Sequence, residues 1–534
     1  MGDDQGAINW RNTDFNLGGF KFAWTSQLVE RGFNRFNDLA EGDRGQLAKE
    51  KGLDRQTYSA SKEWNGGKLA YNALKVENDD GTGFYRRQID VNLPWLKVGF
   101  FDQHVEEGFS RFNDLREEDR KQLAKEAGLV RQSYSIETNM VGRLPFKFGS
   151  SQVRTGTGDL KSTDLAYSGK YFGFEHIRRE ADSGFASFGS MGEADIQHHL
   201  SGIMRMYDPA GPVQGHDRNG FAQMAGLNRS AWRFNIQPMK GLAMKTDALA
   251  IESETGRVDV QSYLLQAGKF NFFFREQASS NEFKAGNNLL VSEQQRLGTA
   301  DGFQKTDLSI TADLNKNRKL ELSSMRAGDQ TGEAARESYS YTDKGFLLSY
   351  NRRQIDAGFA SLNSLVDPER DFFRTILGYD QSDLIAKWQL LPGLSLDFRK
   401  VESNDAVQEL QRQWQNAAIH WDISKLTALG VSRYEQHAFG LDGNMIDQKY
   451  DRYFLSHNFG KLGKLSLTHE EQEFDGLSEE LPDAKRQTIV YETKLGSKLG
   501  LRTENSETKY ENGERETTTS NTVSTEITSR VGVS

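Results

Sequence analysis

The sequence contains no cysteine and only 8 prolines among its 534 residues. The absence of thiols excludes disulfides, thiolate metal sites, cysteine nucleophiles and haem attachment motifs. Scarce proline combined with 51 glycines is typical of a chain that has many strands joined by tight turns. We therefore expect a strand-rich protein without covalent cross-links.

Long apolar runs are missing as well. No stretch approaches eighteen consecutive apolar residues, so the sequence predicts no transmembrane helix. A membrane-spanning strand needs apolar groups at only every second position, and that possibility stays open. The net charge of -9 gives no reason to expect a nucleic-acid partner. The first residues have neither a basic region nor an apolar core, so the sequence predicts no signal peptide. If the protein is exported, we expect this to be a mature or trimmed form, and a cytoplasmic origin is the alternative.

What the chain does have is a recurring hairpin pattern. In residues 384–398, apolar and polar side chains alternate on both sides of the turn Pro392-Gly393. A period of two predicts strands with one buried face. About thirteen such turns predict about 26 strands, with a further strand beginning near Thr517. The turns are Gly18-Gly19, Asn65-Gly66-Gly67, Pro94-Trp95, Gly142-Arg143, Ser168-Gly169, Pro238-Met239-Lys240, Ala267-Gly268, Asn315-Lys316-Asn317, Asp343-Lys344, Pro392-Gly393, Ser424-Lys425, Gly460-Lys461-Leu462-Gly463 and Gly496-Ser497-Lys498.

Short turns alternate with longer connections, which predicts an all-β fold: a large antiparallel up-and-down β-barrel with short turns on one rim and long loops on the other. We expect residues 1–534 to form one barrel domain. Helical loop insertions are predicted at about 30–55, 106–130, 183–227 and 357–380.

A Gly-Phe unit repeats in these four predicted loops, and the copies in 183–227 and 357–380 are weaker than the first two. Each loop should contain a short helix, capped in the first two copies by Asp38 and Asp114. The phenylalanines would hold the helix against the strand ends, either as packing elements or as part of a ligand-binding site. The repeated residues are Gly32, Phe33, Phe36, Gly108, Phe109, Phe112, Gly184, Phe185, Phe188, Gly358 and Phe359.

The apolar positions cluster beside the short turns, as in Phe20, Phe22 and Trp24. Each hairpin arm offers three or four of them, which at about 3.3 Å per residue and a strand tilt near 40° gives a band of roughly 15–20 Å. That is thinner than the band of about 25 Å in a typical membrane barrel. Polar and charged residues occupy the opposite face, as a watery lumen would require. The alternative is a large soluble sheet whose apolar side is covered by protein.

Over almost its full length the chain resembles large bacterial outer-membrane β-barrels in general, by pattern and not by a motif of one specific family. The resemblance implies a bacterial outer-membrane location and contact with the lipid bilayer. It implies a wide pore, a translocon or a sheath, with a plug or partner protein in the lumen or on the long-loop rim. The competing hypothesis is a soluble or cell-surface structural or adhesive sheet protein that uses the Gly-Phe loops for contacts.

Pairs of basic residues recur where strands leave the apolar band. One arginine of each pair must face the lumen, and rings of such charges set selectivity in pores. Ordinary cross-strand ion pairing is the alternative interpretation. The candidate pore or rim charges are Arg86, Arg87, Asp90, Arg178, Arg179, Arg352, Arg353 and Asp356.

The sequence nominates no catalytic residue. His198-His199, near Glu193 and Asp195, could be read as a metal site, but adjacent histidines usually point in different directions, so solvated loop residues are the simpler interpretation. No nucleotide-binding loop, dinucleotide fingerprint or serine elbow is present. We expect no enzyme activity, no cofactor and no bound metal.

Overall fold

A computed structural model describes residues 2–122, 127–140, 144–186, 188, 191, 193–207, 224–283, 288–294, 297–298, 301–365, 367–374, 377–407, 410–439, 445–476, 483–495, 499–528 and 531–533. The chain divides into two compact units. The first comprises Met1–Ala267 and Arg275–Phe303, and the second comprises Gly268–Phe274 and Gln304–Ser534. Strand β15 (Phe270–Ser279) belongs partly to each.

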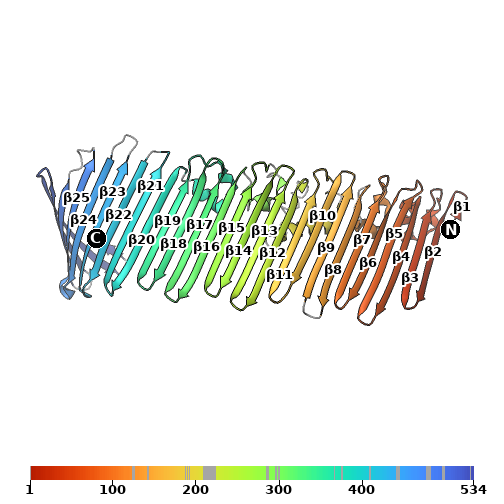
Figure 1. Ribbon diagram of the computed structural model, residues 1–534, viewed down its shortest axis with the longest axis horizontal. Coiled ribbons are helices and arrows are strands. Elements are labelled where there is room, and N and C mark those ends of the chain that lie inside the picture. Colours follow the sequence, from red (N-terminus) through yellow and green to blue (C-terminus); the bar gives the residue numbers. More distant parts are fainter. Residues whose placement is uncertain are drawn as a thin grey trace. The chain divides into compact units, whose positions relative to one another are not determined.

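In the first unit every strand from β1 to β14 pairs antiparallel with the next one in the chain (Figure 1). The strands are β1 (Gly2–Asp3), β2 (Gly6–Leu17), β3 (Phe20–Val29), β4 (Leu53–Trp64), β5 (Gly67–Asn78), β6 (Gly83–Leu93), β7 (Leu96–Val105), β8 (Val130–Met140), β9 (Leu144–Thr155), β10 (Gly158–Ser168), β11 (Phe172–Ala181), β12 (Asn228–Met239), β13 (Leu242–Glu252) and β14 (Arg257–Ala267). The helices are η1 (Phe36–Asp38), α1 (Glu41–Lys49), η2 (Phe112–Asp114), α2 (Glu117–Gln122), α3 (Glu193–Tyr207) and α5 (Val291–Gln294).

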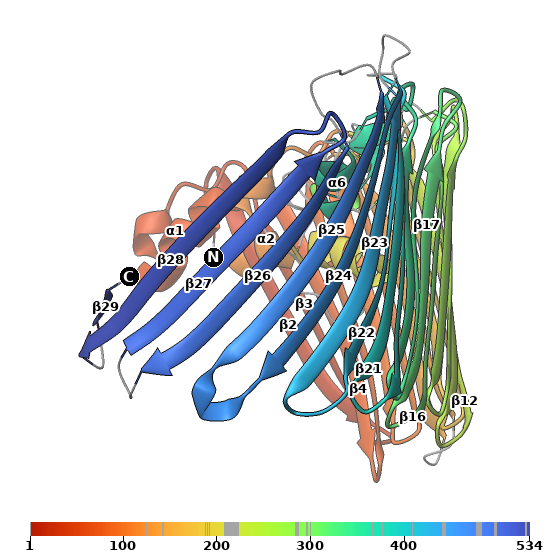
Figure 2. The same ribbon diagram turned by 90° about the vertical axis from the view of Figure 1, so that its left-hand side faces the viewer.

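The second unit continues the same antiparallel order from β16 to β29. Its strands are β16 (Gln304–Asn315), β17 (Arg318–Gly328), β18 (Glu333–Asp343), β19 (Phe346–Ile355), β20 (Tyr379–Leu391), β21 (Leu394–Asp405), β22 (Leu410–Asp422), β23 (Thr427–Phe439), β24 (Met445–Asn458), β25 (Lys464–Gly476), β26 (Ala484–Leu495), β27 (Leu499–Tyr510), β28 (Arg515–Thr528) and β29 (Val531–Val533). The helices are η6 (Ser361–Ser364), α6 (Asp367–Arg374) and η7 (Gly460–Leu462). In the described part of β22–β28 no α-helix interrupts the meander (Figure 2).

The all-β, up-and-down antiparallel prediction is confirmed. The prediction of about 26 strands and a further strand near Thr517 is confirmed, because the described chain has 27 long strands, β2–β28, beside the two short strands β1 and β29. The turn expected at Pro238-Met239-Lys240 falls at Lys240-Gly241, because Gly241 supplies a positive φ of 84° there. The predicted turns Gly142-Arg143 and Gly496-Ser497-Lys498 lie outside the described residues.

The helical loops pack on one face of the strands, which we call the loop face. In β3 it carries Gln27 and Val29, both buried, whereas Phe22 and Trp24 lie on the opposite, aromatic face. Phe22 stacks on Phe15 across β2 and β3, with 4.9 Å between the ring centroids. The core therefore lies between the loops and the loop face, and no second layer covers the described aromatic face.

The loops recur at a regular interval. The residue that follows β3, β7 and β11 is Glu30, Glu106 and Asp182, at intervals of 76 residues, and the series continues at Ser280 and Asp356, again 76 apart. Between Asp182 and Ser280 the interval is longer, because the loop after β11 contains the 15-residue helix α3. The chain thus holds five copies of a four-stranded repeat, each with one long loop. The copy after β15 was not predicted, because Glu282 stands where the other copies have glycine.

One polar side chain anchors each loop to the strand that begins the preceding hairpin. It accepts a hydrogen bond from the backbone N–H 23 residues earlier, at 2.8–2.9 Å in all five copies. The phenylalanine three residues after the anchor is at most 3% exposed in every copy. Burying a side chain of that size contributes about 2–3 kcal/mol. The pairs are Glu30 with Ala7, Glu106 with Gly83, Asp182 with Asp159, Ser280 with Arg257, and Asp356 with Glu333.

A second contact ties three of the strands that follow a loop to the helix of the next loop. It joins a cation to a carboxylate 64 residues later: Arg55 to Asp119, Arg229 to Glu293, and Lys305 to Glu369. Arg131 and Asp195 have the same spacing in the sequence, and the side chain of Asp195 lies outside the described residues. Neighbouring repeats are thereby linked through their loops as well as through strand pairing.

Candidate functional site: the charged loop face beneath helix α3

The three predicted arginine pairs divide between the two faces. Arg86, Arg179 and Arg353 lie on the loop face, on the same side of their strands as Phe84, Ala181 and Ile355, which are buried there. Their chain neighbours therefore lie on the aromatic face. The sequence predicted that one arginine of each pair faces a lumen, and the structure shows that one arginine of each pair lies on the loop face.

The arginines of the aromatic face are engaged in ion pairs beyond the apolar band. Arg87 lies 2.5 Å from Asp102, Arg352 lies 2.9 Å from Asp380, and Arg178 pairs with Glu180. Asp90 lies on the loop face and accepts a hydrogen bond from Gln88. Asp356 is the anchor of the fifth loop. Arg87, Arg178 and Arg352 thus fit the simpler interpretation of local pairing.

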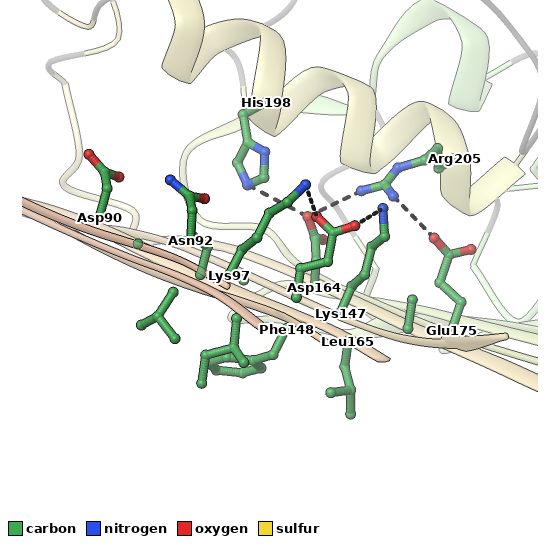
Figure 3. Close-up of a pocket in the computed structure, with 17 residues that line it drawn as sticks. Asp90, Asn92, Lys97, Lys147, Phe148, Asp164, Leu165, Glu175, His198 and Arg205 are labelled. Atoms are coloured by element: carbon green, nitrogen blue, oxygen red, sulfur yellow. Dashed lines mark hydrogen bonds and ion pairs between the residues drawn. The ribbon is translucent and has the colours of Figure 1, made fainter. Parts of the chain in front are cut away.

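A pocket of about 500 Å³ opens between α3 and the loop face of β6–β11. In Figure 3 the polar side chains of the strands point toward α3, whereas Phe148 and Leu165 point to the other side of the sheet. Lys147 and Lys97 share Glu137, with nitrogen–oxygen distances of 3.3 and 4.0 Å. Strands β6–β11 therefore present charged side chains to α3 and apolar side chains on their opposite face.

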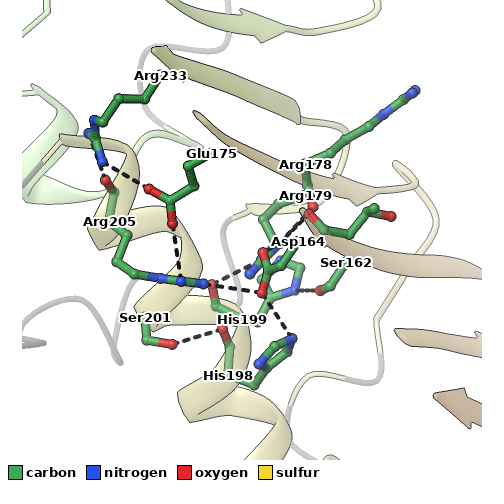
Figure 4. Close-up of polar contacts among 11 residues, drawn as sticks. Ser162, Asp164, Glu175, Arg178, Arg179, His198, His199, Ser201, Arg205 and Arg233 are labelled. Carbon is green, nitrogen blue, oxygen red and sulfur yellow. Dashed lines mark hydrogen bonds and ion pairs between the residues drawn. The ribbon is translucent and has the colours of Figure 1, made fainter. Parts of the chain in front are cut away.

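A chain of ion pairs fastens α3 above these strands (Figure 4). Asp164 receives Arg179 at 2.7 Å and Arg205 of α3 at 3.1 Å. Arg205 also contacts Glu175 at 3.2 Å, and Glu175 in turn contacts Arg233 at 3.0 Å. Arg179 is fully buried, and such a charge is tolerated only where it is paired. The network gives this helix a fixed position on the loop face.

The close approach of α3 depends on a glycine. A Cβ atom built on Gly202 would lie 1.8 Å from a guanidinium nitrogen of Arg179. A side chain at this turn of the helix would displace the Arg179 guanidinium, which pairs with Asp164, so Gly202 is a structural position that the sequence analysis missed. Its signal was the Gly-Ile pair three residues after His198-His199, which has no counterpart in the shorter loops.

The two adjacent histidines lie on α3 and not in an irregular loop, and they differ in environment. His199 is buried, and its Nδ1 lies 2.7 Å from the Ser162 hydroxyl oxygen. Burial, followed by the charges of Arg179 and Arg229, holds the pKa of His199 well below its ordinary value of 6.5. His198 is half-exposed and lies 3.6 Å from Asp164, and burial lowers its pKa as well.

The predicted alternatives for this histidine pair can now be compared. Within the described residues no group of three or more His, Asp or Glu side chains is arranged to hold a metal ion. The side chains of Glu193 and Asp195 lie outside the described residues. His199 acts as a packing and hydrogen-bonding residue between α3 and β10. The described ion pairs make this face of the sheet a fixed, charged surface beneath α3.

The Gly-Phe residues build the loop core. The ring pairs Phe33–Phe36, Phe109–Phe112 and Phe185–Phe188 meet edge to face in each of the first three loops, with centroids 4.8–5.1 Å apart. The glycine before a loop phenylalanine allows the loop backbone to approach the short connection that leads into the preceding hairpin. A Cβ on Gly184 would lie 2.2 Å from the Thr157 carbonyl oxygen, and one on Gly358 would lie 2.7 Å from that of Thr331.

The caps predicted for the loop helices are wrong. Asp38 and Asp114 close the turns η1 and η2, and α1 begins after Ala40 without a side-chain cap. The reason is local, because Arg35 and Arg111, three residues earlier, bind the two carboxylates at 2.7 and 2.8 Å.

Comparisons with known proteins place the chain in no family. No family model and no curated protein matches it. Among solved structures it is similar to Pseudomonas aeruginosa OccK5 (OpdH), with 10% identity, coverage of 56% of this chain and 91% of that chain, and a TM-score of 0.25. It is also similar to OmpT, an outer membrane protein of Vibrio cholerae (12% identity, 53% and 81% coverage, TM-score 0.19). A third is the ferric yersiniabactin uptake receptor FyuA from Yersinia pestis (7% identity, 96% and 71% coverage, TM-score 0.25).

These matches include an outer membrane protein, the class that the sequence pattern resembles. TM-scores this low carry no argument about the function of this chain, which is argued from its own residues below. None of the described helices is both long and apolar enough to span a membrane.

Proposed function

We propose that this chain forms the wall of a wide β-barrel in a bacterial outer membrane, with its aromatic face against hydrocarbon and its loop face around an aqueous space. The observation that carries the proposal is the exposure of large apolar side chains near the short turns of the aromatic face. Contiguous apolar surface of this kind is unusual on a protein that meets only water. Examples are Leu17 (69% exposed), Phe15 (51%), Trp388 (50%), Trp421 (44%) and Leu391 (62%).

The loop face fits the aqueous side of such a wall. Its side chains beneath α3 are Lys, Asp, Glu, Arg and Asn, which would be costly against lipid tails. The helical loops of the five repeats fold over this face, so in the assembled barrel they narrow the conduit and do not project from its rim as docking arms. The strands β22–β28, whose described connections carry no α-helix, leave room for a solute or a partner inside.

The experiment compares the purified protein in plain buffer, in detergent and after addition to planar bilayers. We expect solubility only with detergent, slower gel migration after boiling, and stepwise ion conductance in the bilayer. A protein that stays monodisperse in plain buffer would contradict the membrane wall and favour the cell-surface sheet. Detergent dependence without conductance would support the wall but would assign it to a sheath around a partner.

A further inference from the structure

The fifth repeat carries two arginines directly opposite each other on the loop face. Arg336 of β18 and Arg353 of β19 are register partners. Opposed side chains on one face lie about 5 Å apart at their Cβ atoms, and like charges there are destabilising. The next register pair, Glu337 and Arg352, lies on the aromatic face and carries opposite charges. The same two strands thus pair opposite charges on the aromatic face and like charges on the loop face.

Neither of the two loop-face arginines is paired with a carboxylate among the described contacts. The Arg353 Nε donates to the amide oxygen of Gln381 at 2.7 Å, and its guanidinium lies 5.8 Å from the Tyr379 ring centroid. The guanidinium of Arg336 lies 5.2 Å from the ring of Phe372 in α6. Contacts with aromatic faces hold a guanidinium in place without neutralising it. Both charges therefore remain available and pre-oriented.

These groups line one pocket of about 370 Å³. Arg399 adds a third guanidinium, which Asp383 binds through two hydrogen bonds at 2.7 and 3.0 Å. Asn351 and Gln381 supply neutral polar groups at the wall. On the loop face the lining therefore holds three arginines and one carboxylate, a net charge of about +2 in a chain whose overall charge is -9.

The other repeats show that two opposed arginines are not needed to build this fold. At the position of Arg353 the repeats have Gln27, Gln103, Arg179 and Gln277, and at the position of Arg336 they have Trp10, Arg86, Ser162 and Val260. Arg179 of the third repeat is matched with Asp164. Only the fifth repeat places arginine at both positions.

We propose that the pocket formed by Arg336, Arg353 and Arg399 beneath α6 binds a compact oxyanion that carries carboxylate or phosphate groups. Guanidinium groups present paired N–H donors that match the oxygens of either group. A bound anion would also relieve the repulsion between the opposed arginines. This site rests on the proposed function, because a solute reaches the loop face only where that face lines an aqueous space.

The test uses the full chain in detergent and measures binding of inorganic phosphate and of citrate by calorimetry. We expect one of the two anions to bind, with affinity that falls as salt is added. Arg353→Gln, which installs the residue of three other repeats, should weaken binding at least tenfold, and Arg336→Ser should act in the same direction. Arg318→Gln removes one arginine that lies outside the pocket lining and pairs with Asp343, so it is the matched control and should leave binding unchanged.

The outcomes distinguish a failure of the proposed anion site from a failure of the proposed aqueous conduit. Binding of citrate alone identifies a carboxylate ligand, and binding of phosphate alone identifies a phosphorylated one. If neither anion binds to the unaltered protein, or if Arg318→Gln weakens binding as much as Arg353→Gln, the anion site is overturned even where the bilayer shows conductance. Specific binding without conductance would keep the site and overturn the open conduit. Far-ultraviolet circular dichroism of each variant verifies that its sheet is intact.

Discussion

Arg229 of β12 and Glu293 of α5 form a fully enclosed ion pair, with both side chains 0% exposed. Two parallel hydrogen bonds join them, at 2.7 and 2.8 Å. The Glu293 carboxylate also accepts the backbone N–H of Leu290, so it orders the start of the helix to which it belongs. The pair links the third repeat to the fourth loop, in the same way that Arg55–Asp119 and Lys305–Glu369 link other repeats.

Removing one partner of this pair should be far more damaging than removing both. Glu293→Leu leaves a buried guanidinium without its carboxylate and should cost about 3–5 kcal/mol of local stability, whereas the double replacement Arg229→Leu/Glu293→Leu should recover most of that loss. Hydrogen exchange of the amides in residues 288–294 measures the effect. Equal exchange in the single and double variants would contradict the proposed coupling.

The glycine of the third loop should tolerate no side chain. Gly184→Ala would place a Cβ 2.2 Å from the Thr157 carbonyl oxygen, so the loop must move away from the hairpin, and we expect a loss of about 1–3 kcal/mol. Gly42→Ala in α1 is the control, because nothing lies within 4 Å of its Cβ position, and alanine favours a helix. Limited proteolysis should cleave the 182–227 loop faster in Gly184→Ala and should leave the Gly42→Ala pattern unchanged.

The anchor of the fifth loop should need an acceptor but not a charge. Asp356→Ala removes the 2.9 Å bond from the Glu333 N–H and should destabilise the loop by about 1–2 kcal/mol. Asp356→Ser should retain most of the stability, because Ser280 performs the same role in the fourth repeat. The midpoint of urea denaturation, followed by fluorescence, distinguishes the two. Identical midpoints for both variants would refute the anchor.

Acid should loosen α3. The pKa of His199 is lowered in the folded protein, so an opened helix, in which the pKa returns toward 6.5, binds a proton that the closed form does not accept. The stability of the closed form is therefore fully present above pH 6.5 and is lost progressively as the pH falls below that value. Hydrogen exchange of α3, corrected for intrinsic rates at pH 7.5 and 5.5, should show this loss. His199→Asn should remove the larger part of the pH dependence, and His198→Asn should remove a smaller part, because burial lowers the pKa of both histidines. An unchanged pH dependence in His199→Asn would assign it to another group.

Two neighbouring residues of β21 offer a test of which face meets lipid. Leu396 lies on the aromatic face opposite Trp388, and Ser395 lies on the loop face. Arginine on a lipid-facing strand position costs about 2–4 kcal/mol near the bilayer centre, whereas arginine in the lumen is solvated. Leu396→Arg should thus lower the yield of folding into lipid vesicles, and Ser395→Arg should not. Equal yields would argue against a bilayer at this face.

The helix caps show where local sequence reasoning failed even though the signal was local. The spacing from Asp38 to Glu41 matches a capping box, but the Asp38 carboxylate accepts a hydrogen bond from the Arg35 guanidinium and does not cap the helix. The fourth loop was missed for a related reason, because Glu282 replaces the glycine of the motif while the buried Phe283 and the Ser280 anchor persist. The polar anchor residue three positions before the phenylalanine is more constant among the repeats than the glycine of the motif.

The sequence by itself determined the strands, their antiparallel order and the two unlike faces, because a side-chain period of two and tight glycine turns are local properties of the chain. It also determined that the two arginines of each pair lie on opposite faces, because neighbouring residues of a strand alternate between its faces. Which arginine does so, that the loops cover the charged face, and that α3 is held by Asp164 and Arg205 were decided by the tertiary structure. These features depend on contacts between residues 23 to 64 positions apart, and such contacts form only when the strands are already in register.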